Sequence, residues 1–194
     1  MNRKMQNPIR KRNRLSGYDY TTTGLYFITL VVKDRERVLG NMAGGMIQLS
    51  LHGKIVRDQW IWLHQQYRYL LMDEYVVMPN HFHGIITMAG YCRDRSSRDF
   101  NERNGPDRSL QKMKPLSQLI GAFKTTSSRR IHEIGLVTFQ WQKSFYDHII
   151  RNEKELERVR EYIHTNSLRW ELDIEFGKGM GMTPKTYYHE VLGL

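Results

Sequence analysis

The sequence predicts an α+β fold, an antiparallel sheet with helices on one face. Two observations support this class. Apolar periodicity along the 194 residues gives the order strand, helix, strand, strand, helix, strand, and then one more helix. The hydrophobic share of 40% supplies enough apolar surface for one compact domain. The first six elements, in that order, form the split β-α-β arrangement of ferredoxin-like sandwiches, and the additional C-terminal helix carries Tyr162.

The first half of the chain supplies three strands and a helix of this order. A glycine-rich turn at Gly44–Gly45 leads into a short apolar run at 46–49. Ser50 is placed to cap a helix whose apolar residues recur at helical spacing as far as Gln66. The Pro79-Asn80 pair predicts a hairpin turn between two strands. The stretches rich in β-branched and aromatic residues, predicted as strands, are 26–32, 69–78 and 81–88.

The second half begins with a polar, charged stretch at 91–114, which predicts a long insertion loop. A helix is expected from Pro115 and a strand at 139–150. A last helix is expected from Glu153 to about Asn166, with three acids near its positive N-terminal end. Each of these elements places apolar residues toward a shared core.

The chain divides by composition into three parts. Residues 1–16 form a basic arm that predicts a flexible segment, and residues 17–173 form the domain that includes the 91–114 insertion. The tail at 174–194 has a glycine-rich start, which predicts a flexible connector before a short final element.

Composition excludes two classes of protein. The single cysteine, Cys92, cannot form an internal disulfide or a cysteine-rich zinc site, which excludes a disulfide-stapled secreted scaffold. The longest apolar runs are far shorter than the roughly 18–20 residues that cross a bilayer, and the N-terminal stretch lacks the apolar core of a signal peptide. A cytoplasmic, nucleoid-associated protein without a membrane partner is therefore expected.

The charge distribution predicts a polyanionic partner. Thirty Lys and Arg against twenty Asp and Glu give a net charge of +10. The excess lies in the arm and in residues 91–152, whereas 153–194 is mildly acidic. A solvated terminus without a role and a polar helix end are the alternatives for the basic segments. The candidate contacts to a nucleic-acid backbone are Arg10, Lys11, Arg12, Arg14, Lys124, Arg129 and Arg130.

A His-Phe-His sequence in the predicted strand 81–88 is the first candidate for chemistry. Side chains alternate along a strand, so His81 and His83 project from one face with Cα atoms roughly 6.5–7 Å apart, while Phe82 enters the core. Two imidazoles at that separation can bind one cation. The alternative is a pair of unrelated surface histidines.

The last predicted helix holds the second candidate. Tyr162 and Asn166 are four residues apart and therefore lie together on the flank of the helix. A positioned tyrosine hydroxyl can act as a nucleophile, and an amide oxygen can bind a cation. The alternative is a tyrosine at the core border and an asparagine that ends the helix. Tyr146 is a rival nucleophile, but it is predicted in a strand and lacks an amide partner one helical turn away.

Three sequence blocks, MPNHFHGII (78–86), WQKSFYDHIIRNE (141–153) and YIHTNSLRW (162–170), resemble the signatures of single-tyrosine HUH transposases, and more narrowly those of REP-associated tyrosine transposases. The resemblance implies that His81 and His83 bind a divalent metal, that Tyr162 is the catalytic tyrosine, and that Asn166 completes the metal site. This sequence departs from the family pattern where Ser167 follows Asn166 in place of proline, and in the length of the 91–114 loop.

The resemblance implies a metal-dependent single-stranded DNA endonuclease and strand transferase. It would cleave and rejoin hairpin-associated DNA through a 5′-phosphotyrosine intermediate, with Mg²⁺ or Mn²⁺ as cofactor. A catalytically silent binding module for structured DNA or RNA is the alternative. A metal-dependent hydrolase lacks support, because no carboxylate cluster accompanies the histidines. The sequence leaves open whether the site forms within one chain or across a homodimer.

Overall fold

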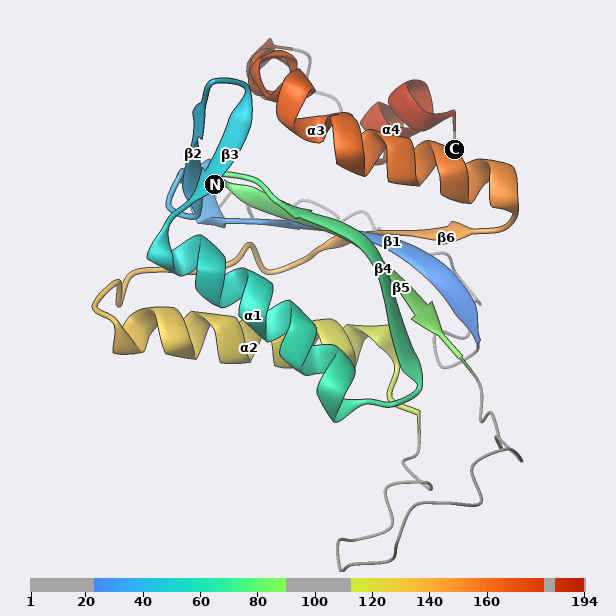
Figure 1. Cartoon of the computed structure of the whole chain (residues 1–194), viewed down its shortest axis with the longest axis horizontal. Helices are drawn as coiled ribbons and strands as arrows, with labels where there is room; N and C mark the ends of the chain where they lie inside the picture. The colour runs from blue at the N-terminus through green and yellow to red at the C-terminus, as the bar shows by residue number, and fades with distance from the viewer. Residues whose placement is uncertain (1–22, 90–112, 180–183, 194) are drawn as a thin grey trace, which may run out of the picture.

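The computed structural model describes residues 23–89, 113–179 and 184–193 (Figure 1). The basic arm, and with it Arg10, Lys11, Arg12 and Arg14, lies outside these residues, as does nearly all of the predicted insertion loop. Among the described residues, no helix combines the length and the apolar character needed to cross a membrane.

The centre of the molecule is a four-stranded antiparallel sheet in the order β4-β5-β1-β6. Its first and third strands along the chain, β1 and β5, lie side by side in the middle, as the predicted ferredoxin-like arrangement requires. The predicted α+β class is therefore confirmed. The strands are β1 (Gly24–Val31), β4 (Leu70–Val77), β5 (His81–Met88) and β6 (Tyr146–Ile150).

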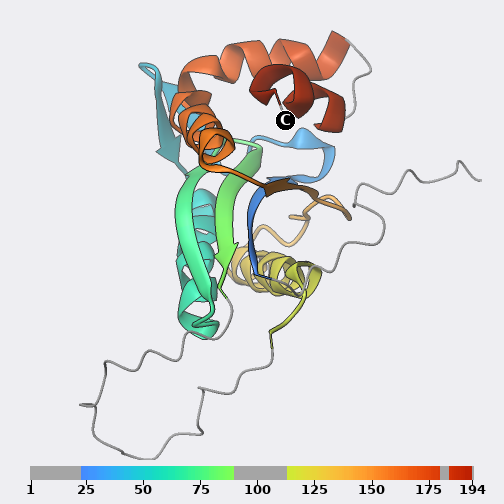
Figure 2. The same cartoon turned by 90° about the vertical axis from the view of Figure 1, so that its right-hand side faces the viewer.

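Helices cover both faces of this sheet (Figures 1 and 2). The α1 helix (Leu51–Gln66) and the α2 helix (Leu116–Glu133) lie on one face, where they share a core with Tyr26, Ile28 and Phe82. The tyrosine-bearing helix α3 (Glu153–Gly179) and the short α4 (Pro184–Leu192) lie on the other face. They share a second core with Phe27 and Ile85, so neighbouring residues of β1 and β5 enter different layers, as strand alternation dictates.

Local signals in the sequence account for the start of α1 and for a small hairpin beside it. The Ser50 hydroxyl accepts a hydrogen bond from the Gly53 backbone N–H at 3.1 Å, which caps α1 as predicted. Strands β2 (Gly40–Ala43) and β3 (Met46–Leu49) form a two-stranded ribbon. Its turn consists of Gly44 and Gly45 with φ of 58° and 74°, a left-handed conformation that glycine adopts at little cost.

The strand predicted at 139–150 is shorter in the structure. Only Tyr146–Ile150 joins the sheet, and Trp141 makes a single bridge to Val32. The segment before β6 is instead attached to α2, since the Trp141 indole N–H donates to the Ser127 hydroxyl and His132 bonds the Phe139 carbonyl. Phe139 and Trp141 are thus buried although the segment pairs with the end of β1 at one bridge only, and a hydrophobic run alone does not distinguish such a segment from a strand.

The α3 helix is longer than expected. It continues through Asn166 to Gly179, so the expected boundary between residues 173 and 174 lies inside a helix. Asn166 is fully buried in the middle of α3 and does not end it. Two hydrogen bonds fix the start of α3. The Asn152 side-chain oxygen accepts from the Glu155 backbone N–H, and the Glu155 carboxylate accepts from the Arg151 backbone N–H.

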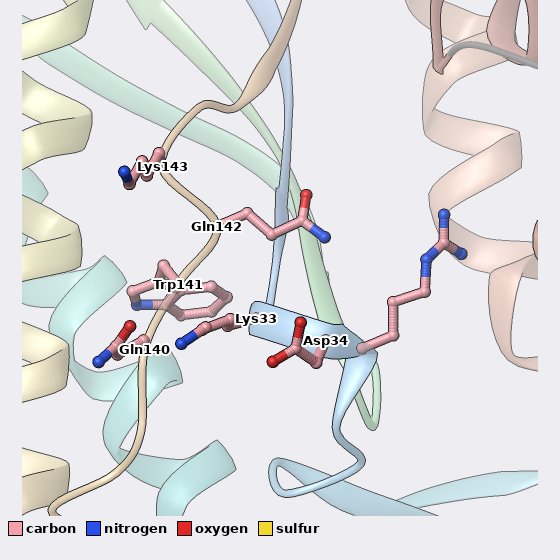
Figure 3. A pocket seen from close by; sticks show the side chains of 7 residues that line it. Lys33, Asp34, Gln140, Trp141, Gln142 and Lys143 are labelled. Atoms are coloured by element: carbon pink, nitrogen blue, oxygen red, sulfur yellow. The ribbon is translucent and has the colours of Figure 1, made fainter. Parts of the chain in front are cut away.

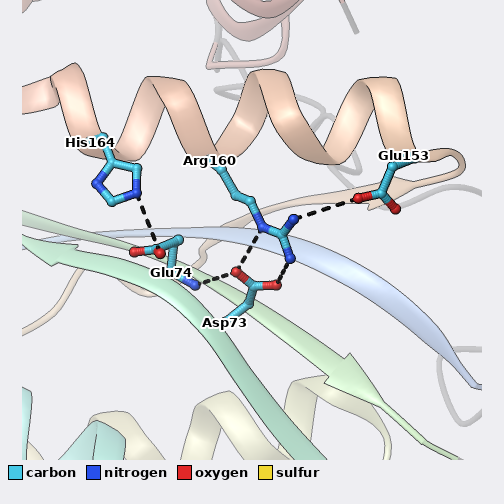
Figure 4. Close-up of polar contacts among 5 residues, drawn as sticks. All are labelled: Asp73, Glu74, Glu153, Arg160 and His164. Carbon is cyan, nitrogen blue, oxygen red and sulfur yellow. Dashed lines mark hydrogen bonds and ion pairs between the residues drawn. The ribbon is translucent and has the colours of Figure 1, made fainter.

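Ion pairs hold α3 against β4 (Figure 4). The Arg160 guanidinium donates two hydrogen bonds to the Asp73 carboxylate, at 3.0 and 2.6 Å, and lies 3.6 Å from Glu153. Beside it, His164 lies 3.4 Å from Glu74. Asp73 and Glu74 occupy an irregularity in the β4–β5 pairing, and both side chains face the helix. The hydrogen bonds from Arg160 lower the pKa of Asp73.

Asp73→Asn is expected to lower the free energy of unfolding at pH 7 by about 1 kcal/mol, because the bidentate pair is charge-assisted but partly exposed. A carboxyl with a lowered pKa stabilises the folded state above its unfolded pKa, and this stabilisation disappears as the pH falls through its folded pKa. Urea denaturation should therefore show a difference between wild type and variant that shrinks below about pH 4. Asp58→Asn, in an exposed pair with Arg57, is the control and should change little. A constant difference down to about pH 2 would contradict the assignment.

Candidate functional site

The two histidines of the His-Phe-His sequence lie together on the face of the sheet that α3 covers. Their ring centroids are 4.6 Å apart. His83 is 1% exposed, whereas His81 at the start of β5 retains partial exposure. Strand alternation alone places them on one face, and burial by α3 gives them a shared environment.

Each histidine ring is oriented by a hydrogen bond at Nδ1. Thr29 on β1 places its Oγ1 at 2.9 Å from His83 Nδ1 and donates its own hydrogen to the Tyr188 hydroxyl at 3.0 Å. Because the Thr29 hydrogen is used in that bond, its oxygen accepts from His83 Nδ1–H. Asn80 places Oδ1 at 2.7 Å from His81 Nδ1. Both rings therefore carry the proton on Nδ1 and keep the Nε2 lone pair, the arrangement found around metal-bound histidines.

Both imidazoles are neutral at pH 7. Burial, followed by the nearby Arg35 guanidinium, lowers the pKa of His81 to about 3, although the Asn166 side chain raises it slightly. Burial, followed by His81, lowers the pKa of His83 well below its ordinary value. Neutral rings retain the lone pairs that a cation needs, so no proton has to be displaced on binding.

The α3 helix places Tyr162 and Asn166 against these rings. The Tyr162 hydroxyl lies 3.5 Å from His83 Nε2, and its ring meets the His83 ring edge-on at 5.3 Å. Tyr162 is 2% exposed and also packs edge-on against Phe27 and Tyr188. The predicted pair thus approaches the histidines within one chain, and a partner copy is not needed to bring them together.

Asn166 has an unusual environment. It is fully buried, and among the described residues neither its side-chain oxygen nor its nitrogen has a hydrogen-bond partner of good geometry. Leaving such a group unsatisfied costs about 1–3 kcal/mol. An amide oxygen beside His81 is a suitable third ligand for a divalent cation, and binding would satisfy it. Within the described ranges no three His, Cys, Asp or Glu side chains cluster as a metal site, so a cation held by the two histidines would need a ligand of another type, such as this amide.

Trp170 closes the site on the side of His81. Its ring stacks on the His81 ring with centroids 5.8 Å apart, and the Arg37 guanidinium lies 5.5 Å from the centre of the same indole. Tyr162, Asn166 and Trp170 follow one another at intervals of four residues, so one face of α3 supplies all three. The sequence prediction named Tyr162 and Asn166 but not Trp170. The same four-residue spacing places Trp170 on their face of the helix.

Tyr146 has no hydrogen bond to either histidine among the described contacts. It lies in β6, packs against Tyr188 with ring centroids 4.5 Å apart, and is buried. Burial, followed by Asp147 and Glu155, raises the pKa of Tyr146 to about 12. Its hydroxyl is therefore harder to ionise than an ordinary tyrosine hydroxyl.

The predicted cationic contacts on α2 lie apart from the histidines. Arg129 and Arg130 are exposed on a helix that covers the opposite face of the sheet, and Arg129 pairs with Glu133 at 3.7 Å. Lys124 points inward, where its ammonium donates to the backbone carbonyls of Gln142 and Lys143. Burial lowers the pKa of Lys124. Its position is that of an anchor for the 140–143 segment.

Comparison with known proteins gives a relative in sequence and likenesses among solved structures. No family model matches the chain. An uncharacterized protein of Haemophilus influenzae is 32% identical over 167 residues, which cover 84% of this chain and 91% of that protein. The structure of a REP-associated tyrosine transposase bound to a REP hairpin superposes with a TM-score of 0.52 at 20% identity, covering 80% of this chain and 73% of that one. This structural likeness, at 20% identity, establishes a shared fold.

Proposed function

The chain belongs to one family with the uncharacterized Haemophilus influenzae protein, and from its site we propose that it is a metal-dependent single-stranded DNA endonuclease and strand transferase. It would cleave and rejoin hairpin-associated DNA through a 5′-phosphotyrosine intermediate. The shared fold with a transposase that binds a REP hairpin, and the net charge of +10, support DNA as the substrate.

One observation carries this proposal, the 3.5 Å separation of the Tyr162 hydroxyl and His83 Nε2. The hydroxyl lies beside the atom that would bind a metal, which is where a scissile phosphate would bind. Tyr162 and His83 are 79 residues apart in sequence, so the fold brings the proposed nucleophile and the proposed metal ligand together. A tyrosine that only filled the core would not need its hydroxyl beside His83 Nε2.

The residues present fit a divalent cation. His81 and His83 through Nε2, and Asn166 through its side-chain oxygen, would hold Mg²⁺ or Mn²⁺. When bound, such an ion would polarise the scissile phosphate and stabilise charge on the leaving oxygen.

In the proposed cleavage step the Tyr162 oxygen attacks phosphorus. The bond from phosphorus to the tyrosine oxygen forms as the bond to the 3′ oxygen of the preceding nucleotide breaks. The products are a 5′-phosphotyrosine link and a free 3′-hydroxyl. The proton that Tyr162 loses is balanced by the proton that the leaving oxygen gains. Since the phosphodiester is exchanged for another phosphodiester, a 3′-hydroxyl can reverse the step and rejoin a strand.

A second candidate function is a catalytically silent module that binds structured DNA or RNA. One observation favours it: Tyr162 is only 2% exposed, with Tyr188 of α4 packed against its ring. Incubation of labelled single-stranded hairpin DNA with the protein and Mn²⁺ separates the two. Adducts that survive denaturing electrophoresis support cleavage, whereas retention of the DNA without adducts supports the binding module.

Thr29→Val is expected to weaken Mn²⁺ binding by roughly 10- to 100-fold, because it removes the acceptor that fixes the His83 ring and its tautomer. The change is nearly isosteric, and titration calorimetry without DNA measures the effect independently of cleavage. Thr126→Val is the matched control, since among the described contacts the Thr126 hydroxyl bonds carbonyls of its own helix, which lies on the other face of the sheet. Equal Mn²⁺ affinity in wild type and Thr29→Val would show that this hydroxyl does not orient the ligand.

A further inference from the structure

A pocket of about 700 Å³ opens beside the end of the sheet that carries His81. One wall is the turn after β1, with Lys33, Asp34 and Arg35, and the other is the segment 140–143 (Figure 3). The two walls are joined by a backbone hydrogen bond from the Lys33 N–H to the Gln140 carbonyl at 2.8 Å. A cavity of this size is large enough for a nucleotide unit.

The charge of the pocket favours an anion. Lys33, Arg35 and Lys143 line it, and among the described residues none of the three forms an ion pair. Asp34 is the single acid among the residues that the structure places in the lining. Cations without a carboxylate partner on a concave surface can pair with a phosphodiester at little cost.

The walls are preformed. The ammonium of Lys124 is bonded to the backbone carbonyls of Gln142 and Lys143, and the Trp141 indole is bonded to Ser127, so α2 supports the second wall. On the first wall, Asp34 and Arg35 adopt φ of 55° and 56°, a left-handed conformation that residues other than glycine rarely adopt. Backbone strain of this kind is concentrated at binding and catalytic sites.

Asn80 connects one wall of the pocket to His81. Asn80 donates from Nδ2 to the Arg35 carbonyl at 3.3 Å, and its Oδ1 holds His81 Nδ1 at 2.7 Å. Arg35 is also near enough to His81 to lower the pKa of that ring. Asn80 thus links the wall that carries Arg35 to His81, one of the proposed metal ligands.

We propose that this pocket binds one nucleotide of the single strand adjacent to the scissile phosphate. Lys33 and Lys143 would pair with its phosphodiester, and the side-chain amides of Gln140 and Gln142, which offer both a donor and an acceptor, would contact the base edge. The proposal rests on the proposed function for the identity of the substrate as DNA, and it assigns a binding site that is separate from the residues proposed for cleavage.

The test is binding of a labelled single-stranded hairpin oligonucleotide in a Tyr162→Phe background, without metal, measured by fluorescence anisotropy at several salt concentrations. The Lys33→Gln/Lys143→Gln double variant should bind on the order of tenfold more weakly. Its slope of log affinity against log salt should be smaller by about 0.7 for each phosphate that the variant no longer neutralises. Lys154→Gln is the control, because Lys154 is exposed next to the opposite end of the sheet. Unchanged affinity and slope in the double variant would overturn the proposal.

A second measurement tests the base contact. An abasic position moved along the single strand should weaken binding to wild type at one position, and Gln140→Ala/Gln142→Ala should lose that position dependence. Equal dependence in both proteins would overturn the assignment of the amides. The two proposals can fail separately. If wild type forms no adduct yet the pocket variants bind DNA weakly, the pocket is a DNA-binding site and the proposed cleavage is wrong. If wild type forms adducts and the pocket variants bind DNA as wild type does, cleavage is supported and the assignment of the pocket is wrong.

Discussion

Tyr162→Phe is expected to abolish covalent adducts with single-stranded hairpin DNA while leaving DNA affinity within about twofold of wild type. The variant removes one oxygen from a ring that is otherwise held by Phe27, His83 and Tyr188, so the packing survives. Removal of a nucleophile leaves no route to the intermediate, and a loss of at least about 10³-fold in adduct yield is expected. Denaturing electrophoresis with end-labelled DNA and Mn²⁺ measures the yield.

Tyr146→Phe is the matched control for this experiment. Tyr146 packs in the same core, and burial raises the pKa of its hydroxyl to about 12, so its loss should leave adduct formation nearly unchanged. Thermal unfolding of both variants checks that each remains folded. Full adduct yield from Tyr162→Phe, or a yield lost only in Tyr146→Phe, would reject the assignment of the nucleophile.

Removal of the proposed divalent metal should have a comparable effect. EDTA, or His81→Ala, is expected to reduce cleavage to the background of protein-free DNA, because the phosphate then lacks its electrophilic partner and, in the variant, only one imidazole ligand remains. His81→Ala should also lose Mn²⁺ binding in titration calorimetry, which does not depend on DNA. His81 retains partial exposure, so the substitution leaves a smaller cavity than a change at His83 would.

The control for this second experiment is His64→Ala. His64 is exposed on α1, on the opposite face of the sheet, and bonds the Leu70 carbonyl. Its loss should leave both Mn²⁺ binding and cleavage as in wild type. Cleavage that continues in EDTA would contradict the metal site, and so would unaltered Mn²⁺ affinity in His81→Ala.

Local periodicity accounts for what the sequence predicted well. His81 and His83 share a face because a strand repeats every two residues, and Tyr162 and Asn166 share a face because a helix repeats about every 3.6. The order of elements predicted the sheet topology, since only a few arrangements connect such elements without crossings. These properties depend on near neighbours and can be read from one sequence.

The supporting hydrogen bonds could not be predicted in the same way. The chain of hydrogen bonds from His83 through Thr29 to Tyr188 spans sequence separations of 54 and 159 residues, and nothing in the local pattern of Thr29 or Tyr188 indicates it. The sequence predicted Lys124 as an exposed contact to DNA, yet its ammonium donates to two backbone carbonyls and points inward. Such outcomes depend on tertiary packing, which overrides residue type.

The most direct measurement is mass spectrometry of the tryptic peptides after reaction with hairpin DNA, Mn²⁺ and nuclease trimming. Trypsin separates the two candidates, because Tyr162 lies in peptide 161–169 and Tyr146 in peptide 144–151. We expect a 5′-linked nucleotide on Tyr162 together with a free 3′-hydroxyl on the released strand. A nucleotide on Tyr146, or cleaved DNA with a 5′-phosphate and an unmodified 161–169 peptide, would contradict the assignment of Tyr162 as the nucleophile.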